Sequence, residues 1–134
     1  MELQPGLIQT KALDVEATRH QAEQIGYNTF VLPADGIIDR ISFFNAIRTT
    51  LPLDPPLIGS RSWDAMSDSL WEGLYTLPDI HIAIIWPNAR VMASMAPSDF
   101  EIALNVLKDI TILLADPHTT NGKPKRITVI VECW

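Results

Sequence analysis

Two long apolar runs constrain the fold of this chain more than any other feature of its sequence. Residues 80–86 (IHIAIIW) and 127–131 (ITVIV) are apolar at almost every position and rich in β-branched side chains. A strand with one face in water alternates apolar and polar residues, whereas a continuous apolar run is typical of a strand covered on both faces. A shorter β-branched and aromatic run precedes Pro33. We therefore expect strands near 28–32, 80–86 and 127–132.

Capping residues and apolar spacing predict four helices between and before these strands. They are expected near 14–25 after Asp14, near 40–51 after Asp39, near 61–75 after Ser60 or Ser62, and near 99–114 after a capping box of Ser98 and Glu101. Gly26 suits the end of the first helix, and Pro52 stops the second because proline lacks the donor that a helix needs.

The predicted order of elements is helix, strand, helix, helix, strand, helix, strand. Strands separated by helices need crossover connections, which are right-handed and favour parallel pairing. We therefore expect an α/β fold with a three-stranded parallel sheet covered by helices. A chain of 134 residues suits a single domain over 1–134. Within it, 1–26 are expected to be an N-terminal extension, of which 1–12 are a loosely attached lead-in.

Charge and composition exclude several classes of protein. Sixteen Asp and Glu against ten Lys and Arg give a formal charge of −6, without the basic stripe that nucleic-acid binders carry. No stretch approaches the roughly 20 apolar residues that cross a bilayer. The single cysteine, Cys133, cannot form an internal disulfide, which favours a reducing compartment. We expect a soluble cytoplasmic protein that is a monomer when free and binds neither nucleic acid directly nor membranes.

The sequence lacks the residues that the motifs of common enzymes require. Gly122-Lys123 resembles the end of a phosphate-binding loop, but the earlier glycine and the following Ser or Thr are missing, and a strand follows. His20, His81 and His118 are scattered and give no metal-ligand spacing. We therefore expect no catalytic residue, no cofactor and no metal site, and we interpret the chain as a protein that is not an enzyme.

The helix predicted near 61–75 carries the most informative pattern. At 100° per residue, one side gathers four large apolar residues that we expect in the core: Trp63, Met66, Leu70 and Leu74. The opposite flank carries three carboxylates at four-residue steps, with the indole of Trp71 beside them: Asp64, Asp68 and Glu72. These three carboxylates are called the acidic ridge below.

Two interpretations of the acidic ridge stay open at this point. Charged residues at this spacing commonly form a solvated helix face. Alternatively, carboxylates on a rigid helix imitate a row of phosphates, and an aromatic neighbour is a common anchor of protein interfaces. Acid–base catalysis is disfavoured, because it needs the carboxylates to face one another across a cleft.

The residues around the ridge resemble the barstar family, the small intracellular inhibitors of bacterial ribonucleases. The similarity extends over about residues 27–134. It rests on Phe43-Phe44-Asn45-Ala46-Ile47 leading to Leu51-Pro52-Leu53, then Gly59, then Trp63-Asp64-Ala65-Met66-Ser67-Asp68-Ser69-Leu70. The apolar strand at 80–86, the helix near 99–114 and the terminal strand follow in the family's order. Ser62 stands where the family carries Asn, and Ile58 where it carries an aromatic residue.

The resemblance implies a barstar-like fold and an inhibitory activity. The chain would bind a basic ribonuclease or related nuclease toxin, as the immunity protein of a bacterial toxin–antitoxin pair, and block its active site with the acidic helix. Asp64 and Asp68 match the two aspartates that face the ribonuclease. The residues expected at the partner surface are Asp64, Asp68, Ser60, Ser67, Trp71, Glu72 and, on the later helix, Asp109. The alternative is a barstar-like interaction or regulatory module with a non-nuclease partner.

Overall fold

The computed structural model describes residues 3–59 and 62–134, which form a mixed α/β fold. The strands within these residues are β1 Gly6–Thr10, β2 Asn28–Val31, β3 His81–Trp86 and β4 Arg126–Glu132. The helices are α1 Val15–Gln24, α2 Arg40–Thr50, α3 Trp63–Tyr75, α4 Arg90–Met95 and α5 Pro97–Ala115. The α/β class and all three predicted strands are confirmed.

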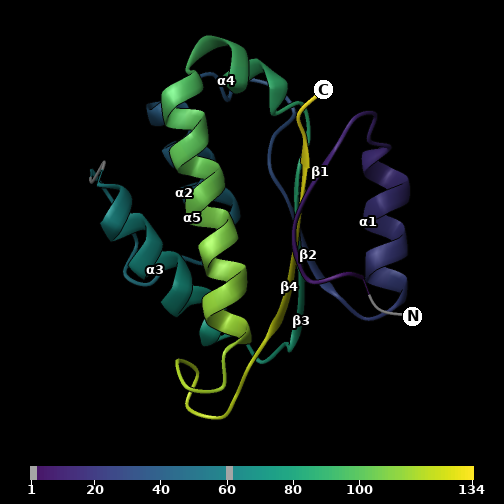
Figure 1. The fold of residues 1–134 in the computed structure, drawn as a ribbon, viewed down its shortest axis with the longest axis vertical. Coiled ribbons are helices and arrows are strands. Elements are labelled where there is room, and N and C mark those ends of the chain that lie inside the picture. Colours follow the sequence, from purple (N-terminus) through teal and green to yellow (C-terminus); the bar gives the residue numbers. More distant parts are fainter. Residues whose placement is uncertain (1–2, 60–61) are drawn as a thin grey trace.

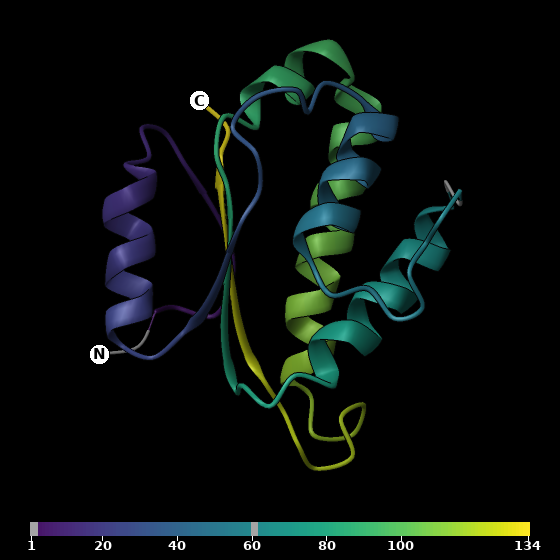
Figure 2. The ribbon, with the colours of Figure 1, turned by 180° about the vertical axis from the view of Figure 1, so that it is seen from behind.

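The sheet is parallel throughout, with the strand order β1-β4-β3-β2. β3 and β4 form its central pair, and each has a hydrogen-bonded strand on both sides. α2, α3 and α5 lie on one side of the sheet, and α1 lies on the other (Figures 1 and 2). The central strands are therefore covered on both faces, which explains why their sequences are apolar without alternation.

The expectation of three strands is wrong at the N-terminal end, where the sheet gains a fourth strand from the supposed lead-in. Gly6–Thr10 pairs with β4, and Leu7 lies opposite Val129. The Glu132 carboxylate fastens the loop after β1, because it accepts hydrogen bonds from Leu13 N at 3.0 Å and from Asn88 N at 2.6 Å. A strand whose partners lie more than 115 residues away leaves no local signal in the sequence.

α1 covers the second face of the sheet and begins as predicted. The Asp14 carboxylate accepts a hydrogen bond from Ala17 N at 3.0 Å, which caps the first turn. Ala22 of α1, Tyr27 and Ala83 of β3 form a small core cluster on this face. The next residue of β3, Ile84, belongs to the large cluster on the other face. Successive residues of β3 therefore serve two separate cores.

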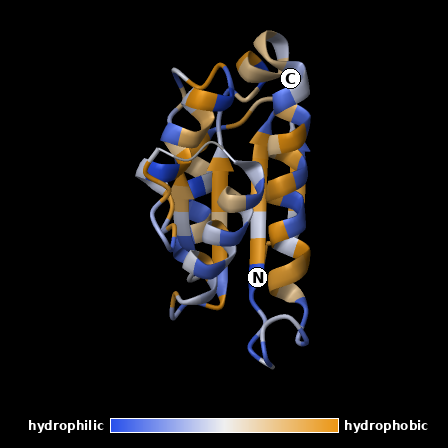
Figure 3. Ribbon diagram, turned by 90° about the vertical axis from the view of Figure 1, so that its left-hand side faces the viewer, coloured by the Kyte–Doolittle hydropathy of each residue, from blue (hydrophilic) through white to orange (hydrophobic). Residues whose placement is uncertain are grey.

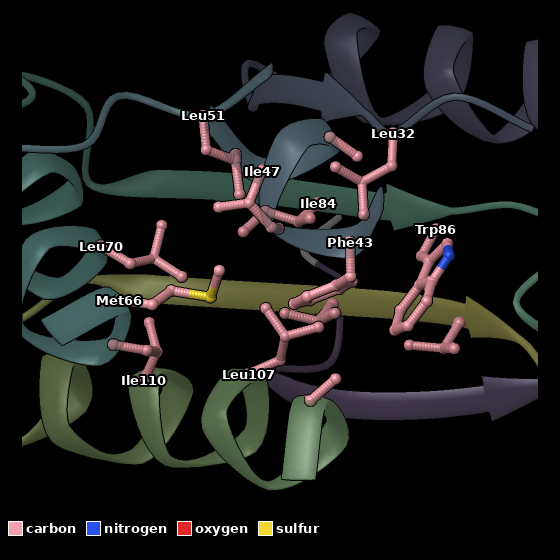
Figure 4. Close-up of a cluster of buried hydrophobic side chains, with 14 of the residues drawn as sticks. Leu32, Phe43, Ile47, Leu51, Met66, Leu70, Ile84, Trp86, Leu107 and Ile110 are labelled. Carbon is pink, nitrogen blue, oxygen red and sulfur yellow. The ribbon is translucent and has the colours of Figure 1, made fainter. Parts of the chain in front are cut away.

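The main core lies between the sheet and α2, α3 and α5 (Figure 4). Its large side chains include Phe43, Ile47, Met66, Leu70, Ile84, Trp86, Leu107 and Ile110. Figure 3 shows mostly hydrophobic strands beside helices that carry hydrophobic and hydrophilic residues on different sides. Within the described residues, no helix is long and apolar enough to span a bilayer.

The segment between β3 and the end of α5 differs from the expectation in two ways. α5 begins at Pro97, and its N-cap residue Ala96 makes no side-chain hydrogen bond, so the capping box expected from Ser98 and Glu101 is wrong. Proline is favoured at the first helical position because its φ is already helical and it needs no partner for an N–H. α4 is a helix of six residues between β3 and α5 that no pattern predicts.

Candidate functional site

The start of α3 fixes which of its side chains face the core. The Ser62 hydroxyl accepts a hydrogen bond from Ala65 N at 3.3 Å and caps the helix, as one of the two predicted alternatives. The other, Ser60, lies outside the described residues. From this start, Met66, Leu70 and Leu74 are fully buried against the main core.

The same helical phase turns the acidic ridge away from the core. Asp64 and Asp68 are exposed, while Glu72 and Ser67 are half-buried. Among the described residues, none forms a hydrogen bond or an ion pair with the carboxylates of Asp64 or Asp68. Two anionic groups one helical turn apart, about 6 Å along the axis, thus face solvent with no partner among residues 3–59 and 62–134. Asp64 also lies in the first turn, where the helix dipole favours a negative charge.

Trp71 is held in place at the C-terminal end of the ridge. Its ring stacks on Tyr75, with centroids 4.8 Å apart and ring planes 21° apart. The Tyr75 hydroxyl in turn donates a hydrogen bond to the Thr120 carbonyl oxygen at 2.8 Å. Trp71 is half-buried, so part of the indole remains available beside the carboxylates. Tyr75 supports the site through these contacts, which sequence spacing did not single out.

Trp63 is half-buried rather than a core residue as predicted. Its ring packs edge-on against Phe44 at 4.9 Å and tilted against Phe43 at 5.9 Å. The Arg40 guanidinium lies 5.6 Å from the Trp63 ring centroid and 5.9 Å from the Phe44 ring centroid. Trp63 therefore lies at the boundary of the core, and α2 contributes a cation beside the N-terminal end of α3. Because Arg40 belongs to another helix, no spacing within α3 could have revealed it.

Gly73 lets the connector between α2 and α3 lie against the buried side of α3. A Cβ atom at this position would be 1.3 Å from the Pro52 carbonyl oxygen, so only glycine fits. The connector is also bonded to the helix, because Asp54 N donates to the Ser69 carbonyl oxygen at 3.1 Å. A glycine inside a helix costs about 1 kcal/mol relative to alanine, so its presence usually has a packing reason. Gly73, in the middle of a predicted helix, is therefore the sequence signal that could have revealed this close contact.

Asp109 is the predicted site residue on α5. It is exposed and directly precedes Ile110, whose side chain lies beside Met66 of α3 in the core (Figure 4). α5 packs against α3, so this carboxylate belongs to the helix that supports the ridge. Both helices therefore present acidic side chains to solvent.

This arrangement suits docking rather than acid–base chemistry. The carboxylates of the ridge are spread along one exposed helix face instead of facing one another across a cleft. Across the described part of the chain, no group of three or more His, Cys, Asp or Glu side chains is arranged to hold a metal ion. What the site offers is fixed negative charge with a supported aromatic ring at one end.

Comparison with known proteins identifies a single family. The family model described as Barstar (barnase inhibitor) matches residues 27–130, which include α2, α3, α5 and most of β4. β1 and α1 precede the matched region. No curated protein and no solved structure matches the chain.

Proposed function

The chain belongs to the barstar family, and from that premise we propose that it inhibits a basic ribonuclease by inserting α3 into the enzyme's active site. It would act as an intracellular immunity protein that neutralises a nuclease toxin by binding alone. Asp64 and Asp68 would take the place of substrate phosphates. Ser67, Trp71 and Glu72 would surround them, and Asp109 would add a contact from α5.

One observation carries the proposal: the exposed Asp64 and Asp68 carboxylates lie on a helix that is otherwise locked to the core. Binding normally costs the entropy of ordering side chains and loops at the interface. The buried Met66 and Leu70 and the close contact at Gly73 already fix the backbone beneath these carboxylates. The site is therefore preorganised for a cationic cleft such as one that binds RNA phosphates.

The charge of the whole chain supports the same partner. A formal charge of −6 attracts a basic enzyme over several ångströms and raises the association rate. Once in contact, the ridge carboxylates and the partner's cations lose water together, and removal of one partner leaves the other charge buried and unpaired.

The test is inhibition of barnase, measured as hydrolysis of an RNA substrate at increasing concentrations of the purified chain. We expect hydrolysis to stop near equimolar chain. The double variant Asp64→Asn, Asp68→Asn should weaken inhibition at least about 30-fold, since truncating a buried charged pair costs about 2 kcal/mol or more. Glu101→Gln is the matched control, because Glu101 is an exposed carboxylate of α5 that lies near Cys133, directly after β4, and is not part of the ridge.

Two results would contradict the proposal. Unchanged hydrolysis at a hundredfold excess of chain would favour a barstar-like module with a non-nuclease partner. Inhibition that is equally strong with the double variant would mean that another surface of the chain binds the enzyme.

A further inference from the structure

A cavity of about 890 Å³ lies at the C-terminal end of α3, and Asp64, Asp68 and Glu72 are not among the residues that line it. Its walls come from Tyr75 and the loop that follows α3, from the loop before β4, and from Pro5. The pairing of Gly6 with Thr128 places Pro5 beside the first residues of β4. The cavity is therefore completed by the N-terminal segment that precedes the family match, and its size is that of a small-molecule site.

The walls of the cavity are largely apolar. Leu77, Pro78, Ile80 and Pro124 line it together with the ring of Tyr75. Ile80 is 56% exposed, an unusual state for a large apolar side chain directly before a central strand. An apolar group that entered the cavity would cover this surface and be stabilised by its own removal from water.

The same cavity gathers positive charge in an otherwise acidic protein. Lys123, Lys125 and Arg126 all line it, and they are three of the ten Lys and Arg in the whole chain. Among the described lining residues, none is acidic. The carboxylate of Asp79 lies close enough to act on the charge of Lys125, and it accepts a hydrogen bond from the Asn28 side-chain amide at 2.9 Å.

Lys125 sits deepest of the three cations. It is 94% buried, and its Nζ donates to the carbonyl oxygens of Leu77 at 2.6 Å and Asp79 at 2.5 Å. Burial lowers the pKa of Lys125, and the nearby Asp79 partly opposes this effect. An ammonium group in such a place is under-solvated, so a further negative charge nearby would stabilise it.

The cavity is held open by the backbone rather than by mobile side chains. Lys125 N donates to the Leu114 carbonyl oxygen at 2.6 Å, and Arg126 N donates to the Ile80 carbonyl oxygen at 2.8 Å. The hydrogen bond from the Tyr75 hydroxyl to the Thr120 carbonyl oxygen fixes the position of the Tyr75 ring in the cavity wall. A ligand would therefore enter a preformed site, without paying the entropy of ordering it.

We propose that this cavity binds a small organic carboxylate with an aromatic or aliphatic body, whose anionic head lies at Lys123 and Arg126 and whose body lies against Ile80, Pro78 and Tyr75. The inference does not depend on the inhibitory function of the ridge. Tyr75 belongs to both places, because it lines the cavity and stacks on Trp71. A bound ligand would thus contact the residue that supports the end of the acidic ridge.

The experiment is an NMR titration of the ¹⁵N-labelled full chain with 2-naphthoate and, separately, with its neutral counterpart 2-naphthamide. The two probes share one ring system and differ in charge. We expect naphthoate to shift the amide signals of Leu77, Gly122 and Lys125 and to bind at least tenfold more tightly than the amide. Lys123→Glu should weaken naphthoate binding at least fivefold, and 0.5 M salt should weaken it as well.

Lys108→Glu is the control for overall charge, because Lys108 is an exposed lysine on α5 outside the cavity. It should leave naphthoate binding unchanged within twofold. The proposal is overturned if naphthoate and naphthamide bind equally, if Lys108→Glu acts as strongly as Lys123→Glu, or if no signal shifts at 1 mM naphthoate. Signals that shift only outside the cavity would overturn it too.

Discussion

Leu70 and Asp68 lie two residues apart in α3 and occupy opposite environments. Leu70 is fully buried between α3 and the main core, whereas Asp68 projects into solvent without a partner among the described residues. One side chain therefore contributes to stability and the other to binding. Leu70 stabilises the helix in its place, and Asp68 is available for binding.

Leu70→Ala should therefore lower the free energy of unfolding by about 2–5 kcal/mol, because it removes buried methyl groups and leaves a cavity. Asp68→Ala should change it by less than about 1 kcal/mol, as substitutions at solvated positions do. Urea unfolding followed by tryptophan fluorescence measures both values. Similar losses for the two variants would mean that α3 has a different rotational phase.

Asp39 shows the effect of a helix cap on titration. Its carboxylate accepts hydrogen bonds from Ser42 N at 2.9 Å and from the Ser42 hydroxyl at 2.7 Å, and these lower the pKa of Asp39. A carboxyl group with a lowered pKa in the folded state stabilises the fold above the pKa of the unfolded chain, about 3.9. This stabilisation is lost as the pH falls through the folded pKa.

Ser42→Ala should raise the pKa of Asp39 toward the ordinary aspartate value, but not fully, because the hydrogen bond from Ser42 N, which lowers the pKa more, remains. A ¹³C NMR titration of the Asp39 carboxyl measures the change. The variant should also lose less stability than the wild type when the pH is lowered below 4. Ser94→Ala, at an exposed serine of α4, is the control. An Asp39 pKa that is the same in both variants would contradict this account.

At the scale of elements, the connector between α2 and α3 is as important as α3 itself. Pro52, Pro55 and Pro56 prevent this segment from continuing the helix, and Gly73 allows its backbone to approach α3 closely. The connector leads into the N-terminal end of the acidic helix. Its contact with α3 therefore fixes the direction in which the ridge points.

Gly73→Ala should destabilise the fold by about 3 kcal/mol or more, because the added methyl group meets the backbone of Pro52 and not a flexible side chain. The gain in helix propensity, about 1 kcal/mol, is too small to offset this clash. Ser67→Ala on the same helix is the matched control and should be nearly neutral. Thermal unfolding measures both. A Gly73→Ala variant as stable as the wild type would show that the connector can move away freely.

Some elements could be predicted from the sequence and others could not, for physical reasons. β3 and β4 are buried on both faces, so they leave continuous apolar runs, and α1 and α2 begin at side-chain caps that are visible locally. β1 is a short edge strand whose only signal is its distant pairing with β4. α4 has six residues and no side-chain cap. Both depend on tertiary contacts that local patterns do not record.

Some features of the candidate site could likewise be predicted from the sequence, and others could not. The spacing of Asp64, Asp68 and Glu72 predicts a shared flank because it depends on helix geometry alone. The positions of Arg40 over Trp63 and of Tyr75 against Trp71 depend on how helices and loops pack. Trp63 was expected in the core because it falls on the same side of α3 as Met66 and Leu70. It is only half-buried because it is the first residue of α3, at the edge of the core.

At the scale of the whole molecule, charge is distributed unevenly. The formal charge is −6, yet Lys123, Lys125 and Arg126 gather at the C-terminal end of α3 while the acidic ridge lies along its exposed flank. A basic ribonuclease would be oriented by this asymmetry before contact. The ridge end of α3 attracts it, and the cation-lined end repels it.

This distribution leads to a kinetic prediction for the complex with the ribonuclease. The association rate should fall as salt rises from 50 to 300 mM, because screening shortens the reach of exposed charges to about 10 Å or less. Asp68→Ala should mainly raise the dissociation rate, since it leaves a cation of the enzyme buried without its counter-charge. Glu72→Ala should have a smaller effect than either aspartate, because Glu72 lies at the end of the ridge and is already half-buried.

Surface-binding kinetics at two salt concentrations separate these effects for Asp64→Ala, Asp68→Ala and Glu72→Ala, with Glu101→Gln, an exposed carboxylate of α5 outside the ridge, as the control. Each variant removes one negative charge, so all four should slow association slightly, and Glu101→Gln should slow it least because Glu101 does not belong to the ridge. Desolvated contacts depend on position, so only the two aspartates should shorten the lifetime of the complex strongly. An association rate that does not respond to salt, or a dissociation rate raised as much by Glu101→Gln as by Asp68→Ala, would falsify the acidic ridge as the inhibitory surface.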